Sequence, residues 1–422
     1  MLGAFKSSMK AGDLRKRILF TLLMFLIFRI GAHIPVPGIN AGAMEALIKG
    51  GGNILGFFDV ISGGAFKRFS IFAMSITPYI NASIIMQLLT VVVPKLEQLS
   101  KEGEEGRKKI TQYTRYGTVI LGFIQSLGMA FTLRASGALL NTSIGEFLII
   151  AVTLTAGTAF LMWLGEQITE KGIGNGISLI IFAGIVSAIP GGLYNIYNSL
   201  KAGTINFFSV ILLIIIAAIV IAAVVAVNEG QRRIPVQYAK RVVGRRVYGG
   251  QSTHIPLKVN QAGVIPVIFA SSILMFPTTI ANFFHGSPVA DWIVNTFRWG
   301  GPTQTIFYAL FIIFFTYFYT AITFNPMDVA DNMRKYGGFI PGLRPGKPTA
   351  EFLDKILTRV TLSGAVFLAL IAVLPTFVLA TTKIQNIYFG GTSLLIVVGV
   401  ALETMKQIES HLLMRHYQGF MK

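Results

Sequence analysis

The sequence predicts an all-α polytopic membrane protein with ten transmembrane helices in two inverted halves of five. Three observations support this. The chain of 422 residues is 53% hydrophobic and 13% charged, with a mean hydropathy of +0.66. It contains uncharged apolar runs of about twenty residues, the length that crosses a bilayer as a helix. Its basic residues gather in alternate loops. A transmembrane barrel is disfavoured, because its strands would show alternating polarity.

Ten apolar segments are predicted to span the membrane. They lie at residues 18–34, 71–93, 116–133, 147–165, 173–190, 205–227, 262–284, 303–325, 360–380 and 387–405. The first follows a basic cluster, as in a signal peptide, but it leads into His33 and Pro37 without a small-residue cleavage site. We therefore expect an uncleaved first span.

The basic residues set the topology. Placing the N-terminus in the cytoplasm puts most of the 36 Lys and Arg residues on that side, so both termini are predicted to be cytoplasmic. Each half has an odd number of spans, so the second half enters from the opposite face. Any structural repeat between the halves must then be inverted.

One pattern, Pro-x-Ile-x-Ala-Ser-x-Ile, occurs at 78–85 and again at 266–273. Each copy lies in the second span of its half. The five matching residues would carry little weight in so apolar a chain without this equivalent placement. The placement favours an inverted repeat, and Pro78 and Pro266 are expected to bend the two spans.

The second, third and seventh spans carry polar residues that suit lipid poorly. These are Gln87 and Thr90, then Gln125, then Ser271 and Ser272. Two interpretations are open: ordinary hydrogen bonding within a helix bundle, or the border of an aqueous or openable path.

Ionisable residues are nearly absent from the spans. Arg29 lies near the outer end of the first span, where a snorkelling side chain is favoured over a functional one. An ion-coupled secondary transporter usually needs acidic or histidine groups near the membrane centre, and none is found there. A purely structural scaffold would not need a polar, proline-containing pair of spans.

Motifs for catalysis are missing. The chain has no cysteine, so it has no disulfide and no thiolate chemistry. It has no Walker A sequence, and its five histidines form no metalloprotease pattern. The glycine-rich segment 172–176 reads as a turn rather than a phosphate cradle, because no βαβ unit surrounds it. We predict a protein that is not an enzyme and that holds no cofactor or metal.

Three connecting segments are unusual. Residues 53–64 form an apolar segment on the outer side that is too short to span; an interfacial helix is favoured over a re-entrant one. The loops at 229–261 and 326–356 are long enough to form folded projections, and the first is strongly basic. They suggest a platform that docks an acidic partner or RNA. The basic candidates are Arg232, Arg233, Lys240, Arg241, Arg245, Arg246 and, in the second loop, Arg344.

Six dispersed segments give the chain a resemblance to the SecY family, the central subunits of bacterial protein-conducting channels. They are TPYINASIIMQ at 77–87, KEGEEGRKKITQYTRYG at 101–117, GIGNGIS at 172–178, KVNQAGVIP at 258–266, ADNMRK at 330–335 and PGLRPG at 341–346. The resemblance implies an N-terminal half at 1–190, a hinge loop at 191–206 and a C-terminal half at 207–422, arranged around a central pore.

The resemblance also implies the functional residues. A pore ring would fall on Ile76, Ile80, Ile181, Ile185, Ile268 and Ile396. A plug at 54–66 would include Ile54, Leu55, Phe57, Phe58, Asp59, Val60 and Ile61, which replaces the interfacial interpretation. The polar residues of the second, third and seventh spans would belong to a lateral gate that also includes the eighth span.

The implied function is a channel that passes unfolded secretory polypeptides across a bacterial inner membrane and releases transmembrane segments sideways into the lipid bilayer. The implied partners are the SecE and SecG membrane subunits, the SecA motor or the ribosome at the basic loops, and signal sequences with nascent chains. Because no nucleotide site is found in the chain, the energy would come from the partner.

Overall fold

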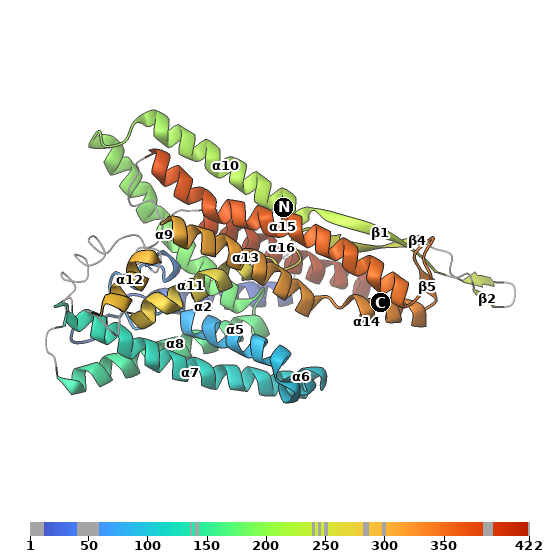
Figure 1. Ribbon diagram of the computed structural model, residues 1–422, viewed down its shortest axis with the longest axis horizontal. Coiled ribbons are helices and arrows are strands. Elements are labelled where there is room, and N and C mark those ends of the chain that lie inside the picture. Colours follow the sequence, from blue (N-terminus) through green and yellow to red (C-terminus); the bar gives the residue numbers. More distant parts are fainter. Residues whose placement is uncertain are drawn as a thin grey trace.

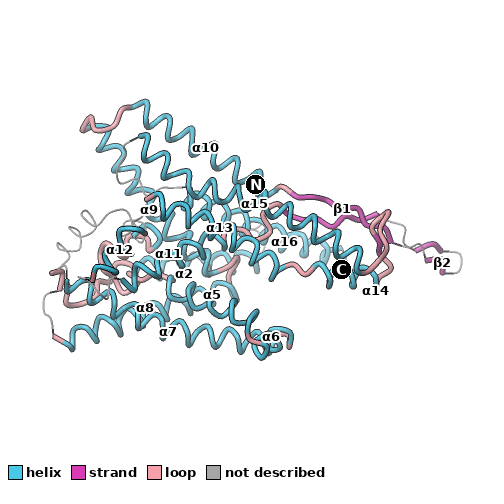
Figure 2. Tube along the Cα trace, in the orientation of Figure 1, coloured by secondary structure: helices cyan, strands magenta, loops and turns pink. Residues whose placement is uncertain are grey.

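The computed structural model describes residues 12–39, 59–135, 137–139, 143–238, 241–243, 246–248, 252–281, 287–297, 301–382 and 391–420. These residues form an elongated bundle of helices, from one end of which a small β-sheet projects (Figure 1). Figure 2 shows that the strands are confined to this end. The fold class expected from hydropathy is therefore confirmed.

Within these ranges, each predicted span overlaps one helix, although several ends differ. The helices are α2 (Gly12–Gly31), α5 (Thr77–Val92), α7 (Glu104–Ala135), α8 (Ile144–Lys171), α9 (Gly176–Lys201), α10 (Phe207–Glu229), α11 (Ile265–Ala281), α13 (Pro302–Thr323), α15 (Lys347–Thr382) and α16 (Gly391–Phe420). In the described part of the chain, six helices are long and apolar enough to cross a membrane alone. A seventh qualifies if α5 and α6 (Pro94–Lys101), which meet at a 99° bend, are taken as one span.

The two halves meet along two seams. In Figure 1, α5, α7 and α8 lie along one side of the bundle, whereas α10, α13, α15 and α16 lie along the other. Helix α11 lies between them and contacts α5 and α7 as well as α13. The second seam is formed by α9 and α16. The first is called the α5/α11 seam below, and the second the α9/α16 seam.

The repeated pattern marks two helix starts, so the expectation of proline bends at these sites is wrong. Pro78 occupies the first turn of α5, and Pro266 is the second residue of α11. Proline is favoured in a first helical turn, where its missing N–H has no intrahelical partner anyway. Residues 71–76, predicted as helix, instead form turns in which Ser75 has a φ of +52°. A proline does lie inside α11, at Pro277.

The expected hinge loop at 191–206 is mostly helical. Helix α9 continues through Pro190 to Lys201, so only residues 202–206 separate it from α10. A proline removes one main-chain hydrogen bond, but neighbouring helices and local adjustments allow a membrane helix to continue beyond it. The end of the fifth span, predicted at residue 190, is therefore corrected to Lys201.

The two projecting loops form one sheet. Strands β1 (Gln231–Tyr238) and β4 (Ser252–Lys258) pair antiparallel, from Gln231 opposite Lys258 to Gln237 opposite Ser252. The other edge of β1 pairs with β5 (Gly338–Phe339), which follows α14 (Pro326–Lys335) in the second loop. A separate ribbon of β2 (Arg241–Val243) and β3 (Arg246–Tyr248) lies beyond.

The main apolar core joins both halves. Buried side chains from α2, α5, α8 and α9 are continuous with those from α10, α11, α13, α15 and α16. A second core, around Phe69 and Leu154, packs the turns before α5 against α8. A third, which includes Ile234 and Val236 of β1, fixes the sheet to α14 and α15. In lipid such packing, rather than expulsion from water, holds helices together.

Candidate functional site

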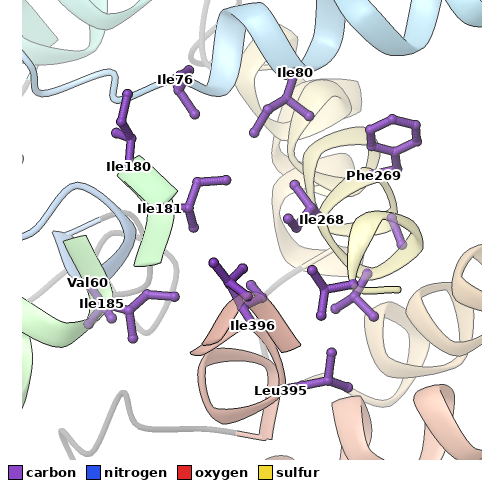
Figure 3. Close-up of a cluster of buried hydrophobic side chains, with 14 of the residues drawn as sticks. Val60, Ile76, Ile80, Ile180, Ile181, Ile185, Ile268, Phe269, Leu395 and Ile396 are labelled. Atoms are coloured by element: carbon purple, nitrogen blue, oxygen red, sulfur yellow. The ribbon is translucent and has the colours of Figure 1, made fainter. Parts of the chain in front are cut away.

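The six isoleucines predicted to form a ring lie together in the main core. Ile76 is the N-cap of α5, Ile80 lies in its first turn, Ile181 and Ile185 lie on α9, Ile268 on α11 and Ile396 on α16. They are between 0% and 8% exposed and belong to one cluster. Figure 3 shows them converging from these elements on a common centre. The structure thus brings together residues from both halves.

Local geometry explains how two elements supply two residues each. The Ile80 amide donates to the Ile76 carbonyl at 3.1 Å, so the two side chains are one helical turn apart. Ile181 and Ile185 have the same spacing on α9 and share a face. A constriction lined by such aliphatic branches offers water no hydrogen bonds and excludes ions by dewetting.

Further buried residues in this cluster were not predicted. Ile180, Phe269 and Leu395 lie beside predicted ring residues in the sequence and in the core (Figure 3). Phe269 meets Phe315 of α13 edge to face, with ring centroids 5.9 Å apart. It thereby packs the helix that carries Ile268 against its own half. No sequence signal distinguished these residues from other apolar residues of the spans.

Residues 59–67 form a compact turn beside the cluster, called the 59–67 turn below. The Asp59 carbonyl accepts from the Gly64 amide at 2.8 Å, and the Asp59 carboxylate accepts from the Lys67 amide at 2.7 Å. Val60 is 6% exposed and packs near Ile185 (Figure 3). Burial raises the pKa of the Asp59 carboxyl, while the Lys67 amide bond acts in the opposite direction. Of the predicted plug residues, Ile54, Leu55, Phe57 and Phe58 lie outside the described residues.

Arg29 does not snorkel toward a membrane surface, so that expectation is corrected. Its Nη1 atom donates to the Gly63 carbonyl at 2.6 Å and to the Ser187 hydroxyl at 3.0 Å. The guanidinium therefore joins α2 to the 59–67 turn and to α9. A charge within a span is costly, and a snorkelling side chain would avoid that cost by reaching the membrane surface. Here the hydrogen bonds of Arg29 to a carbonyl and a hydroxyl of the protein offset the cost instead.

The predicted gate residues lie on helices that border the α5/α11 seam, but their hydrogen bonds stay local. Gln87 donates to Ser83 at 3.4 Å, and Thr90 donates to the Gln87 carbonyl at 2.7 Å, both within α5. Ser271 donates to the Ile268 carbonyl at 2.8 Å within α11. Gln125 and Ser272 are buried on α7 and α11. The described bonds of Gln87, Thr90 and Ser271 therefore stay within one helix and do not cross the α5/α11 seam.

The α9/α16 seam is built differently. The Gly174 amide, in the turn before α9, donates to the Gln407 side-chain oxygen of α16 at 2.8 Å. The same turn is held by α2, because the Ile173 amide donates to the Thr21 hydroxyl at 3.2 Å. Gly174 has a φ of +88°, which favours glycine. The glycine-rich segment is thus a turn, as predicted, and it ties α2 and α9 of one half to α16 of the other.

The described basic candidates lie on the projecting strands and on the loop after β5. Arg232 and Arg233 are exposed on β1, while Arg241 and Arg246 belong to β2 and β3. Lys240 and Arg245 lie outside the described residues. Arg344 is exposed, and its carbonyl accepts from the Thr349 hydroxyl at 2.8 Å, which anchors the backbone of its loop. Among the described residues, no group of three or more His, Cys, Asp and Glu side chains could hold a metal ion.

These features define a class: a multi-spanning helical membrane protein whose two halves enclose a sealed apolar centre. A SecY family profile matches residues 70–405. A relative from Halalkalibacterium halodurans, called protein translocase subunit SecY, is 52% identical over 432 residues and covers 100% of both chains. The subunit of the same name from Escherichia coli (strain K12) is 48% identical over 419 residues, covering 97% of this chain and 94% of that one. The chain belongs to the SecY family.

Solved structures share the fold at low sequence identity. One, described as a protein conducting channel, has a TM-score of 0.68 at 21% identity and covers 94% of this chain and 92% of its own. A second, in which the plug domain of SecY is described as stabilising the closed state and maintaining a membrane seal, has a TM-score of 0.69 at 20% identity over the same shares. A third, Sec61 in the canine ribosome–channel complex, has a TM-score of 0.65 at 20% identity, again over 94% and 92%.

Proposed function

We propose that this chain is a protein-conducting channel that passes unfolded polypeptides across the membrane and releases transmembrane segments sideways into lipid. One observation carries the proposal: isoleucines from α5, α9, α11 and α16 meet in one buried cluster between the halves. The relatives that are protein translocase subunits support it. The channel has no NTPase of its own and takes its energy from a partner.

The physical mechanism begins with the apolar ring. Flexible aliphatic side chains seal around an extended chain without binding it tightly, and they exclude water and ions when the channel is empty. Ile76, Ile80, Ile181, Ile185, Ile268 and Ile396 form this ring in our proposal.

Opening is proposed to occur at the α5/α11 seam, while the α9/α16 seam and residues 202–206 act as the hinge. The difference in bonding supports this assignment, because the Gly174–Gln407 hydrogen bond crosses the α9/α16 seam, whereas the bonds of Gln87 and Ser271 stay within α5 and α11. An apolar nascent helix that reaches the gap gains about 0.3–0.6 kcal/mol per central Leu, Ile, Phe or Val on entering lipid.

The proposed setting is a bacterial inner membrane with both termini in the cytoplasm. There the sheet and Arg344 would dock a SecA motor or a ribosome, and the exposed arginines of β1 suit an acidic protein or RNA surface. The solved canine Sec61 complex with a ribosome supports the second partner. Small SecE and SecG subunits would cover apolar helix faces such as α10.

Trapped translocation intermediates test the channel directly. Single cysteines at Ile80, Ile268 or Ile396 should crosslink to a polypeptide halted midway, and the absence of native cysteine keeps the background low. A cysteine at Ile215, on the exposed face of α10, is the matched control and should not crosslink. Crosslinks from Ile215 alone, with none from the three ring positions, would overturn the proposal.

Replacing Arg344 by alanine should lower motor-driven export by about tenfold, as expected for the loss of one charged contact across an interface. The backbone of the loop should persist, because Thr349 binds the carbonyl rather than the side chain of Arg344. The measurement is uptake of a secretory precursor by membrane vesicles with equal amounts of the chain. Lys201→Ala, a change of the exposed last residue of α9, should export normally. Equal export by the two variants would refute the docking role.

A further inference from the structure

Arg29 occupies an unusual place for a charged residue. It lies in the last turn of α2, within a predicted membrane span, and its side chain is only partly exposed. Its Nη1 atom makes both of its long-range hydrogen bonds, to the Gly63 carbonyl and the Ser187 hydroxyl. Hydrogen bonds from an ionised donor are shorter and stronger than neutral ones. The 2.6 Å distance to Gly63 fits such a bond.

The polar groups at this contact satisfy one another. The Ser187 hydroxyl donates its proton to the Gly184 carbonyl at 2.7 Å, which leaves its oxygen free to accept from Arg29. A hydroxyl has one proton and two acceptor positions, so both bonds form together. The bond to the Gly184 carbonyl within α9 thus orients the Ser187 hydroxyl so that its oxygen can accept from Arg29.

The 59–67 turn lies directly on α9 at this point. A side chain added at Gly184 would place its first carbon 2.2 Å from the Ile61 carbonyl oxygen. One added at Gly63, where φ is +68°, would place it 2.7 Å from the Ser187 hydroxyl oxygen. Glycine at both positions lets backbone meet backbone. The next residue on α9, Ile185, belongs to the apolar cluster that also contains Val60.

We propose that Arg29 is a positioning residue that holds the 59–67 turn against α9 and so keeps Val60 packed beneath the isoleucine cluster in the closed channel. This inference rests on the proposed function. Because Arg29 links Gly63 of the turn to Ser187 of α9, the turn can leave α9 only if at least one of these two bonds breaks. Arg29 thus sets how readily the empty channel loses its seal, without contacting the translocating chain.

The test uses the full chain in its native membrane, with Val60→Cys as a reporter in the cysteine-free background. Val60 is 6% exposed, so a membrane-impermeant maleimide should modify the reporter slowly at rest. Arg29→Gln should raise the modification rate by about tenfold, since a charge-assisted bond is replaced by a weaker one. Ser187→Ala should raise it less, and Arg29→Lys should fall between Arg29→Gln and the unchanged residue. Arg68→Gln removes an exposed charge that repels Arg29, so it should not raise the modification rate.

A second pair of variants covers the case in which Arg29→Gln does not accumulate. Gly184→Ala pushes against the Ile61 carbonyl and should expose the reporter, whereas Gly191→Ala on the same helix meets no atom within 4 Å and should not. Slow labelling in an Arg29→Gln variant that accumulates normally would overturn the proposal, and so would slow labelling in Gly184→Ala if Arg29→Gln does not accumulate. The proposed function would survive that result if a trapped polypeptide still crosslinked to the ring and speeded labelling of Val60→Cys. If no polypeptide crosslinked to the ring, the proposed function would be refuted, whatever the labelling of Val60→Cys.

Discussion

Replacing Ile80 and Ile268 together by alanine is expected to make resting membranes leak ions about tenfold or more, the change that follows from lowering a barrier by roughly 1.4 kcal/mol. Each change removes most of an aliphatic side chain from opposite sides of the α5/α11 seam (Figure 3). A wider constriction admits water, and water carries ions. Alanine keeps both helices intact, because its helix propensity is higher than that of isoleucine.

The leak would be measured as the single-channel or bulk conductance of the complex in planar bilayers without a translocating chain. The matched control replaces Ile215 of α10 and Ile306 of α13 by alanine. These residues are 49% and 61% exposed, so the same chemistry is removed away from the centre. Tight membranes with the first pair, or equal leaks with both pairs, would contradict the assignment of the seal.

Gly157→Ala should destabilise the protein by about 1–3 kcal/mol or more, the range seen when a packed interior is overfilled. The added carbon would lie 1.9 Å from the Ile71 carbonyl oxygen, and a backbone atom cannot rotate away as a side chain can. The Ile71 amide is itself bonded to the Ile34 carbonyl at 3.0 Å, so the turn before α5 is held from both sides.

The same helix supplies the control. Gly145→Ala in α8 places its carbon 3.7 Å from the nearest atom, an ordinary contact. It should leave stability unchanged or raise it by up to about 1 kcal/mol through helix propensity. The readout is the midpoint of thermal unfolding in detergent, with the amount of folded protein in the membrane as a second measure. A normal midpoint for Gly157→Ala would show that α8 and the turn are not in rigid contact.

The spans can be predicted from the sequence, because every span must be apolar to cross lipid and the loops on the cytoplasmic side carry the basic residues. The residues at which the helices begin and end are harder to predict. Pro78 is predicted to bend a helix but lies in the first turn of α5, and the span predicted to end at residue 190 continues as a helix to Lys201. From the local sequence one can infer only that a proline perturbs the backbone. Whether a helix starts, bends or continues there depends on the segments packed around it.

In the candidate site, too, some residues can be predicted from the sequence and others cannot. The repeated pattern and the family resemblance led to Ile80 and Ile268, since both depend on residues close together in the sequence. The bonds of Arg29 to Ser187 and of Gly174 to Gln407 join positions 158 and 233 residues apart. No periodicity or motif encodes such pairs, so snorkelling was the reasonable expectation for Arg29 and it was wrong.

The shared sheet has a mechanical consequence. Because β1 pairs with β4 on one edge and with β5 on the other, the two projecting loops belong to one sheet and are expected to move together. Strand β4 leads through a short connection into α11, whose side faces α5. We therefore expect a partner bound at the loop of Arg344 to act, through β5 and β1, on the strand that leads into the helix that carries Ile268.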